Sequence, residues 1–353
     1  MLRNAAAVDL FCGVGGLTHG LIKSGIRVLA GVDLDSTCEF AYEKNNKRAK
    51  FIGMDIADPD LPDLLNDLYP SKGVRILVGC APCQPFSAHT QKYKGMRKDK
   101  KWGLIKKFGK VLKELEPDVV SMENVPLLQK QDIFLDFITE LEEDLGYEIS
   151  AEVVDCTAYG IPQKRKRLVM LASRLGPISL DPSKATSPKM TRETIGDLEP
   201  IPAGGVSTQD RLHRARGLTE INLERIQKSR PGGSWRDWDE SLLAPCHRRS
   251  SGQTYSSVYA RMEWDTPSPT ITTQFNSFGS GRFGHPEQDR ALSLREGALL
   301  QTFPPNYEFF PKDLPEELIS AERLSTHIGN AVPVRLGQII GKTIVKHILT
   351  HTA

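Results

Sequence analysis

Short apolar runs alternate with helical stretches through the first 175 residues, and this alternation limits the chain to few folds. Runs of strand length are AAAVDLF (5–11), RVLAGVDL (27–34), RILVGC (75–80) and DVVSMENV (118–125). Helical stretches such as THGLIKSG (18–25) and LIKKFGKVLKELE (104–116) separate them. Strands that alternate with helices form a parallel sheet covered on both faces. We therefore predict an α/β fold with a doubly wound, mostly parallel sheet, completed by a strand pair at YEISAEVVD and RLVMLAS.

A second, loop-rich domain is expected after this pattern ends. The 353 residues are enough for two domains, and residues 184–290 are rich in Ser, Thr, Gly, Pro and Arg with little periodicity. The segment 332–349 again has an amphipathic helical pattern, which favours a return to the first domain. The predicted parts are a first domain over 1–183, a smaller second domain over 184–290 and a returning segment over 291–353.

Composition indicates a cytoplasmic protein that is not bound to a membrane. No apolar stretch reaches the roughly 18 residues that a membrane-spanning helix needs, and the N-terminus does not resemble a signal peptide. Six scattered cysteines do not form a disulfide framework. The formal net charge is only +2, but the run Lys92–Lys113 contains ten Lys or Arg residues and one acid, Asp99. Such a run is either a solvated helix face or a surface for a polyanion.

A glycine-rich turn, DLFCGVGGLTHG (9–20), follows the first predicted strand, where open α/β sheets bind ligands. Glycines at 13, 15 and 16 would let a ligand approach the backbone, although a tight strand-to-helix turn is an alternative explanation. The spacing is not that of a dinucleotide site, because Thr18 stands where the third glycine belongs. Asp33, at the end of the second strand, could accept hydrogen bonds from a ribose, and Asp55 from an adenine amino group. A nucleoside without a phosphate chain suits this turn, and S-adenosylmethionine is one.

Two cysteines lie three positions apart in VGCAPCQPFS (78–87). A structural zinc site needs four ligands, and no second Cys pair follows, so we expect no metal ion. A redox pair would begin a helix, which Pro85 disfavours, and the zinc deaminase signature fails because Phe86 replaces its second cysteine. Cys80, on the strand, is interpreted as a small core residue. Cys83, in the loop, is either an inert thiol or a nucleophile that requires positive surroundings.

Six sequence blocks occur in the order found in one family. They are DLFCGVGG, PCQPFS, MENV, QKRKR, LSLREGALLQTFP and IGNAVP, and they extend from Asp9 to about Ile340. In these blocks the chain resembles the DNA cytosine-5 methyltransferases. The resemblance implies an S-adenosylmethionine-dependent methyltransferase fold, S-adenosylmethionine as cofactor, duplex DNA as partner, and a target recognition domain at 184–290.

The resemblance also implies catalytic roles for four residues. Cys83 would add to carbon 6 of a cytosine flipped out of the duplex, which makes carbon 5 a nucleophile toward the methyl group. Glu123 of MENV would contact ring nitrogen 3, where it could relieve the negative charge that the addition creates. Arg165 and Arg167 of QKRKR would orient this glutamate and bind the carbonyl oxygen of the base.

Cofactor and DNA contacts are implied in the same way. Many relatives carry an aromatic residue where Leu34 follows Asp33, so the adenine would be covered by an aliphatic side chain here. Recognition would use the run Lys92–Lys113, the stretch PSPTITTQ (267–274), and Arg211, Arg214, Arg216, Arg248 and Arg249. The implied cofactor residues are Phe11, Gly13, Gly15, Gly16, Asp33, Leu34, Asp55, Ile56, Asn330 and Val332.

The family's usual setting implies a monomer that protects DNA from a cognate restriction endonuclease, without physical pairing being required. Three other functions remain open. The first is the same chemistry on transfer RNA, which the roughly 100-residue region between QKRKR and LSLREG disfavours because that branch has a reduced recognition region. The second is a non-catalytic DNA-binding relative, disfavoured because both Cys83 and Glu123 are present. The third is a nicotinamide oxidoreductase, disfavoured by the glycine spacing.

Overall fold

The computed structural model describes residues 5–81, 103–181, 186–254 and 256–352, which form two compact units. Unit 1 comprises Met1–Tyr159, Lys166–Thr186 and Val332–Ala353, and unit 2 comprises Gly160–Arg165 and Ser187–Ala331. These divisions differ from the domain boundaries expected from the sequence. Unit 2 extends past residue 290 to Ala331 and also takes in Gly160–Arg165, so only the last 22 residues return to unit 1.

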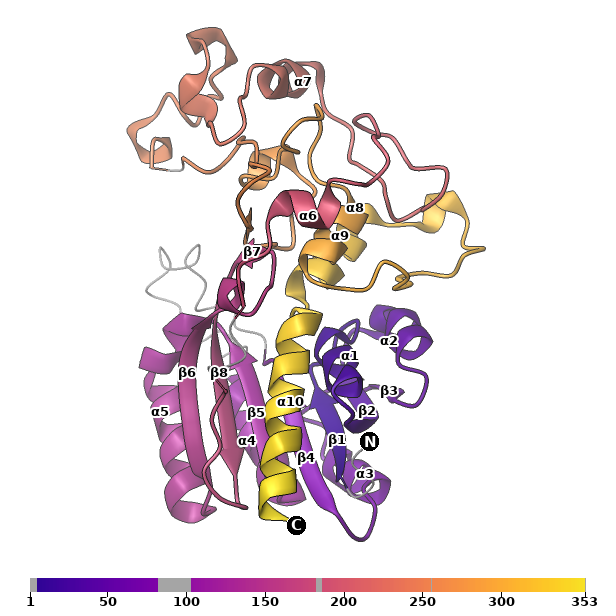
Figure 1. Ribbon diagram of the computed structural model, residues 1–353, viewed down its shortest axis with the longest axis vertical. Helices are drawn as coiled ribbons and strands as arrows, with labels where there is room; N and C mark the ends of the chain where they lie inside the picture. Colours follow the sequence, from indigo (N-terminus) through magenta and orange to yellow (C-terminus); the bar gives the residue numbers. More distant parts are fainter. Residues whose placement is uncertain (1–4, 82–102, 182–185, 255, 353) are drawn as a thin grey trace. The chain divides into compact units, whose positions relative to one another are not determined.

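Unit 1 is built on one seven-stranded sheet (Figure 1). Its strands are β1 (Ala5–Leu10), β2 (Arg27–Asp33), β3 (Lys50–Gly53), β4 (Val74–Gly79), β5 (Val119–Asn124), β6 (Glu148–Asp155) and β8 (Lys166–Ser173). They lie in the order β3-β2-β1-β4-β5-β8-β6. The first five are mutually parallel, whereas β8 is antiparallel to both β5 and β6. The structure therefore confirms the predicted α/β fold, including the strand pair at its end.

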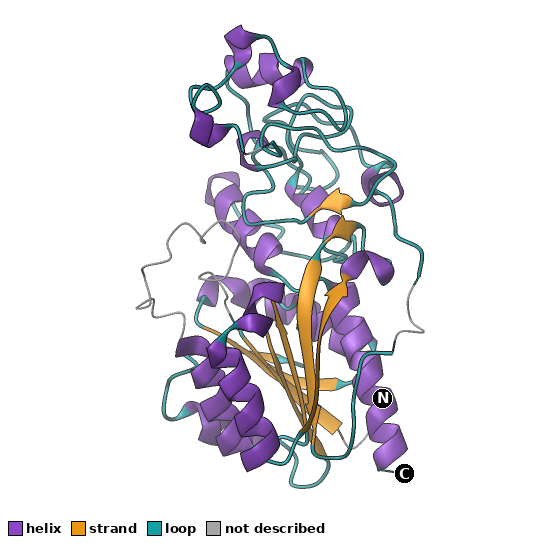
Figure 2. Cartoon of the chain, turned by 90° about the vertical axis from the view of Figure 1, so that its left-hand side faces the viewer, coloured by secondary structure: helices purple, strands orange, loops and turns teal. Residues whose placement is uncertain are grey.

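Helices cover both faces of this sheet (Figures 1 and 2). They are α1 (Gly16–Lys23), α2 (Glu39–Asn45), α3 (Leu61–Leu68), α4 (Gly103–Leu115), α5 (Asp132–Thr139) and α10 (Val334–His351). One face packs against α3, α4 and α5, where a single apolar core joins Val8 and Leu10 of β1 to Leu65, Phe108 and Phe134. Burial on both faces explains why every residue of β1 and β5 is buried.

The last helix, α10, belongs to unit 1 and packs directly on α1. The two helices approach closely because glycines lie at their contact. A Cβ atom added at Gly20 would lie 2.5 Å from backbone atoms of Val334 and Gly337, and one added at Gly337 would lie 2.9 Å from the carbonyl oxygen of Leu17. Across the described ranges of the chain, no helix has both the length and the apolar character needed to cross a lipid bilayer.

Unit 2 contains little regular secondary structure, as its composition predicts. Its elements include β7 (Gln163–Lys164), α6 (Thr191–Ile195), α7 (Glu220–Gln227), β9 (Ser268–Pro269), α8 (Leu294–Leu300) and α9 (Ala321–Asn330). A buried ion pair helps to hold it together: Arg290 donates to the two Glu296 carboxylate oxygens at 2.8 and 2.7 Å. Ser293 and Glu296 also form a capping box at the start of α8. The block LSLREGALLQTFP contributes to the interior of unit 2, since its residues Leu292, Leu294, Ala298, Leu300 and Phe303 are buried.

The contact between α1 and α10 generates a stability prediction. Replacement Gly20→Ala should lower the free energy of unfolding by about 1–3 kcal/mol, because the added methyl group meets backbone atoms that cannot rotate away. Urea unfolding followed by far-UV circular dichroism measures the change. Gly103→Ala is the matched control, since a Cβ atom at Gly103 meets nothing within 4 Å. Equal unfolding curves for both variants would contradict the proposed close packing.

A buried carboxyl in β1 generates a pH prediction. Asp9 is 1% exposed and accepts a hydrogen bond of 2.6 Å from the Thr18 hydroxyl, and burial raises its pKa from 3.8 to about 7. The folded state therefore favours protonated Asp9, so this stabilisation is complete below about pH 4 and is lost as the pH rises through 7.

Asp9→Asn should remove this dependence, which the raised pKa puts at about 4 kcal/mol between pH 4 and 8. The measurement is the free energy of unfolding of both proteins across this pH range. The variant should gain stability relative to the wild type as the pH rises. Parallel pH curves for the two proteins would show that Asp9 titrates normally.

Candidate active site

The predicted site residues of unit 1 follow the carboxyl ends of neighbouring parallel strands. In the sheet, Leu10 of β1 lies opposite both Val32 of β2 and Gly79 of β4, and Gly79 lies opposite Met122 of β5. The residues just after these positions therefore share one edge of the sheet, which is where open α/β sheets bind ligands.

The glycine turn is tied to the end of β2. Gly13 and Gly15 adopt positive φ angles of 50° and 87°, which L side chains rarely adopt, and Phe11 also has a positive φ of 60°. The Gly13 N–H donates to Asp33 Oδ2 at 2.8 Å, and the Cys12 N–H to the Val32 carbonyl at 3.1 Å. A Cβ atom at Gly13 would meet nothing within 4 Å, so the turn borders open space. Gly16 begins α1, with Gly15 as the N-cap.

Acceptor groups and an exposed apolar side chain surround this turn. Asp33 accepts one backbone N–H on each carboxylate oxygen, the second from Asp35 at 2.9 Å, and each oxygen has a further lone pair. Leu34 is 72% exposed. Asp55 lies two residues beyond β3, accepts the Ala57 N–H and is 3.5 Å from Lys107 Nζ, whereas Ile56 is buried.

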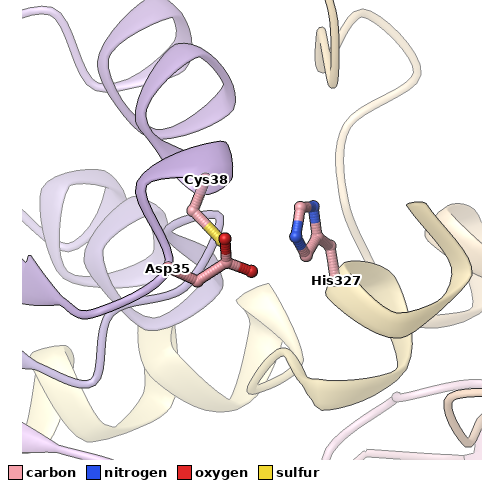
Figure 3. A group of neighbouring side chains, drawn as sticks. All are labelled: Asp35, Cys38 and His327. Atoms are coloured by element: carbon pink, nitrogen blue, oxygen red, sulfur yellow. The ribbon is translucent and has the colours of Figure 1, made fainter. Parts of the chain in front are cut away.

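Asp35 precedes the short helix η1 (Ser36–Cys38) after β2, and Cys38 is the last residue of this helix (Figure 3). Asp35 caps the helix by accepting the Thr37 N–H at 3.0 Å. Burial, together with the charges of Asp33 and Asp35, raises the pKa of the Cys38 thiol well above its ordinary value. Cys38 is buried, so its side chain packs within this turn. His327, also drawn in Figure 3, belongs to α9 of unit 2.

A buried carboxylate lies at the end of β5. Glu123 is 2% exposed, and Arg167 Nε of β8 is 2.9 Å from its Oε1. Cys80 follows β4, and its thiol donates to Glu123 Oε2 at 2.9 Å. The interpretation of Cys80 as a core residue was therefore incomplete, because its half-buried side chain binds the carboxylate.

Asn124 is a neighbour that the sequence analysis missed. This buried residue donates from Nδ2 to the Ala81 carbonyl at 3.1 Å, which ties β5 to the segment after β4. Its place directly after Glu123 in MENV was the available signal. The predicted nucleophile Cys83 lies outside the described residues, as does Lys92–Lys101 of the basic run.

The block QKRKR divides between the two units. In unit 2, Arg165 is 3% exposed and donates to the Ile271 carbonyl at 3.1 Å, and β7 pairs with β9 of the PSPTITTQ stretch. Arg167 lies in unit 1, where it contacts Glu123. The implied cofactor residues divide similarly, because Asn330 ends α9 in unit 2 and Val332 begins the last segment of unit 1.

Several basic residues expected on DNA have partners within their own unit. Lys107, Lys110 and Lys113 of α4 form ion pairs with Asp55, Glu114 and Glu140, so this part of the basic run is a solvated helix face. The contact of the run Lys92–Lys113 with phosphates stays a prediction.

Two of the five arginines expected to contact DNA have partners within unit 2. Arg211 donates to the carbonyl oxygens of Lys312 and Leu314, and Arg214 pairs with Glu316, so both stabilise unit 2. Arg216, Arg248 and Arg249 are exposed. Arg248 also lines a cavity of about 710 Å³ together with Trp235 and His247, whose rings stack at 4.1 Å.

Comparisons with known proteins indicate the family of this chain. The family model described as C-5 cytosine-specific DNA methylase matches residues 5–346. The Type II methylase M.HgiDII of Herpetosiphon aurantiacus is 52% identical, over 96% of this chain and 94% of that protein. The Type II methyltransferase M.PspPI of Psychrobacter sp. (strain TA137) is 31% identical, over 98% of this chain and 80% of that protein.

A solved structure shares the fold over nearly the whole chain. Spodoptera frugiperda DNMT2 superimposes with a TM-score of 0.67 at 16% identity, over 97% of this chain and 99% of that one. The family match, the relatives and the buried glutamate of MENV beside β8 lead to one assignment. The chain belongs to the C-5 cytosine-specific DNA methylase family and is a DNA cytosine-5 methyltransferase.

Proposed function

We propose that this enzyme transfers the methyl group of S-adenosylmethionine to carbon 5 of a cytosine flipped out of duplex DNA, through a transient bond to Cys83. The observation that carries the proposal is the Glu123 carboxylate, which is buried at the end of β5 and paired with Arg167 at 2.9 Å. Asn124 ties this strand end to Ala81, two residues before Cys83. A carboxylate that is buried from solvent and lies near Ala81 suits a contact with a bound base.

The chemistry follows from the electron demand of the pyrimidine ring. The Cys83 thiolate adds to carbon 6, and the electron pair of the 5,6 double bond moves to carbon 5. Glu123, protonated as the base binds, would share this proton with ring nitrogen 3, which offsets the negative charge that develops there. It would recover the proton when the ring is restored, while Arg167 pairs with its carboxyl group. Carbon 5 would bond to the methyl group as that group's bond to the sulfonium sulfur breaks, with the bonding pair staying on sulfur as a neutral thioether. Carbon 5 would then lose its proton to a base. The released electrons restore the double bond and expel the thiolate, so Cys83 is regenerated.

S-adenosylmethionine supplies, when bound, an electrophilic methyl group on a sulfonium centre. The residues after β1, β2 and β3 fit this group. The remaining lone pairs of Asp33 suit ribose hydroxyls, Asp55 offers an acceptor for an adenine amino group, and exposed Leu34 offers an apolar surface for a ring. Gly13 leaves space for close approach, as its open Cβ direction indicates. We extend the cofactor site to Phe11, Gly15, Gly16, Ile56, Asn330 and Val332 on the family resemblance.

Duplex DNA is the proposed partner of unit 2, which would be the target recognition domain. Arg216, Arg248 and Arg249 are the exposed arginines that could contact phosphates or guanine edges. We place Arg165 at the carbonyl oxygen of the base. Several relatives are Type II methyltransferases, a class named for restriction-modification systems, so we propose that the enzyme acts as a monomer that protects DNA from a cognate endonuclease.

Expression in a bacterial host without cytosine methylation tests this function. Bisulfite sequencing of the host genome should show methylated cytosines at one short sequence and none elsewhere, because one recognition domain reads one site. The same DNA should resist an endonuclease that cuts this sequence.

The matched control is Cys83→Ser, which should abolish methylation and keep DNA binding in gel retardation, since serine is a far weaker nucleophile. Methylation of transfer RNA with unmodified genomic DNA would reassign the substrate. Undiminished methylation by Cys83→Ser would refute the covalent mechanism.

Asp33→Asn tests the cofactor site. The variant should bind S-adenosylmethionine about tenfold or more weakly, because hydrogen bonds to a charged acceptor contribute about 1.5–3 kcal/mol. Isothermal titration calorimetry measures the affinity. Asp155→Asn is the control, because Asp155 also accepts the N–H two residues along but lies at the end of β6. Equal affinities for both variants would exclude Asp33 from the site.

A further inference from the structure

Cys80 occupies a position that the proposed mechanism does not use. It follows β4 directly, and its backbone N–H donates to the Leu10 carbonyl at 3.3 Å. This hydrogen bond holds the Cys80 backbone in place. The thiol donates to Glu123 Oε2 at 2.9 Å. The side chain is half-buried, so this contact is shielded from competition with bulk water.

We propose that Cys80 is a positioning residue that holds the Glu123 carboxylate for the flipped base. The two oxygens of this carboxylate have different neighbours: Arg167 Nε is 2.9 Å from Oε1, and the Cys80 thiol is 2.9 Å from Oε2. Oε1 pairs with the Arg167 charge but has no hydrogen-bond partner among the described residues, so the Cys80 thiol supplies the directional contact that orients the carboxylate plane. This inference rests on the proposed role of Glu123 toward the base.

A thiol suits this position because of its donor strength. Cysteine is a weak hydrogen-bond donor, and a carboxylate oxygen has more than one lone pair. The thiol can therefore orient Oε2 while occupying only one of its lone pairs, so another lone pair stays available for the ring nitrogen. An arginine or lysine at this position would bring a second full charge to Glu123.

Substitutions at Cys80 separate positioning from packing. Cys80→Ala should lower kcat about tenfold and change KM for DNA less than twofold, because the contact acts on the reacting group and not on DNA binding. Cys80→Ser should recover most of the lost kcat, since a hydroxyl can also donate to Oε2. Cys156→Ala is the control, because it removes a buried thiol of the same unit that the mechanism does not use.

Two kinetic outcomes would overturn the proposal. One is a kcat of Cys80→Ala within twofold of the wild-type value. The other is equal impairment of the Ala and Ser variants, which would indicate that only side-chain volume matters. If the wild-type enzyme itself fails to methylate DNA, the proposed function fails, and the contact between the two side chains remains testable by spectroscopy.

A spectroscopic test does not depend on enzyme activity. A substitution at Cys80 is used in it only to assign the S–H band. The S–H stretching band of Cys80, assigned by its loss in the Ser variant, should move to higher wavenumber in Glu123→Gln, because a neutral acceptor binds the thiol less strongly. An unchanged band would show that the thiol does not donate to Glu123 and would overturn the proposal.

Discussion

The proposed chemistry depends on keeping one carboxylate, that of Glu123, ordered in a buried position. A buried charge is costly unless it is paired and hydrogen-bonded. The sheet meets this requirement by changing direction at β5: β4 is parallel to β5 on one side, and β8 is antiparallel to it on the other. The parallel neighbour brings the residue after its carboxyl end, Cys80, and the antiparallel neighbour brings a residue near its amino end, Arg167. The strand order thus supplies partners for both oxygens of Glu123.

The same sheet edge separates two kinds of polar chemistry. Near the ends of β1 and β2, each carboxylate oxygen of Asp33 accepts a hydrogen bond from a backbone N–H, one from Gly13 and one from Asp35. Around β5, side chains from two neighbouring strands hold Glu123. In the proposed mechanism, the first arrangement leaves lone pairs for a nucleoside, and the second holds one group for proton sharing.

Much of the fold could be predicted because its signals are local. Alternating apolar and amphipathic runs predict the parallel sheet, and the switch to poor periodicity predicts the loop-rich unit. The boundaries of the second unit could not be predicted, because α8 and α9 have ordinary helical patterns and belong to unit 2 through tertiary packing such as the buried Arg290–Glu296 pair.

Only part of the site could be predicted, because the partners of its side chains come from segments that are distant in the sequence. Glu123 and Arg167 follow from the family resemblance, and the structure brings them together. Cys80 resembled a core residue because cysteine is commonly buried, and the register of β4 and β5 that aims its thiol at Glu123 leaves no local signal. Arg211 and Arg214 look like DNA contacts in composition, but their partners come from residues about 100 positions away. The role of Cys83 stays a prediction from the sequence.

Covalent trapping on DNA tests the central claim most directly. Duplex DNA with 5-fluorocytosine at the target position is incubated with the enzyme and S-adenosylmethionine, and the DNA-linked peptide is identified by mass spectrometry. Fluorine cannot leave carbon 5 as a proton does, so the thiolate cannot be expelled, and the account predicts a stable adduct at Cys83. An enzyme that methylates ordinary cytosine yet forms no such adduct, or forms it at a different residue, would contradict the account.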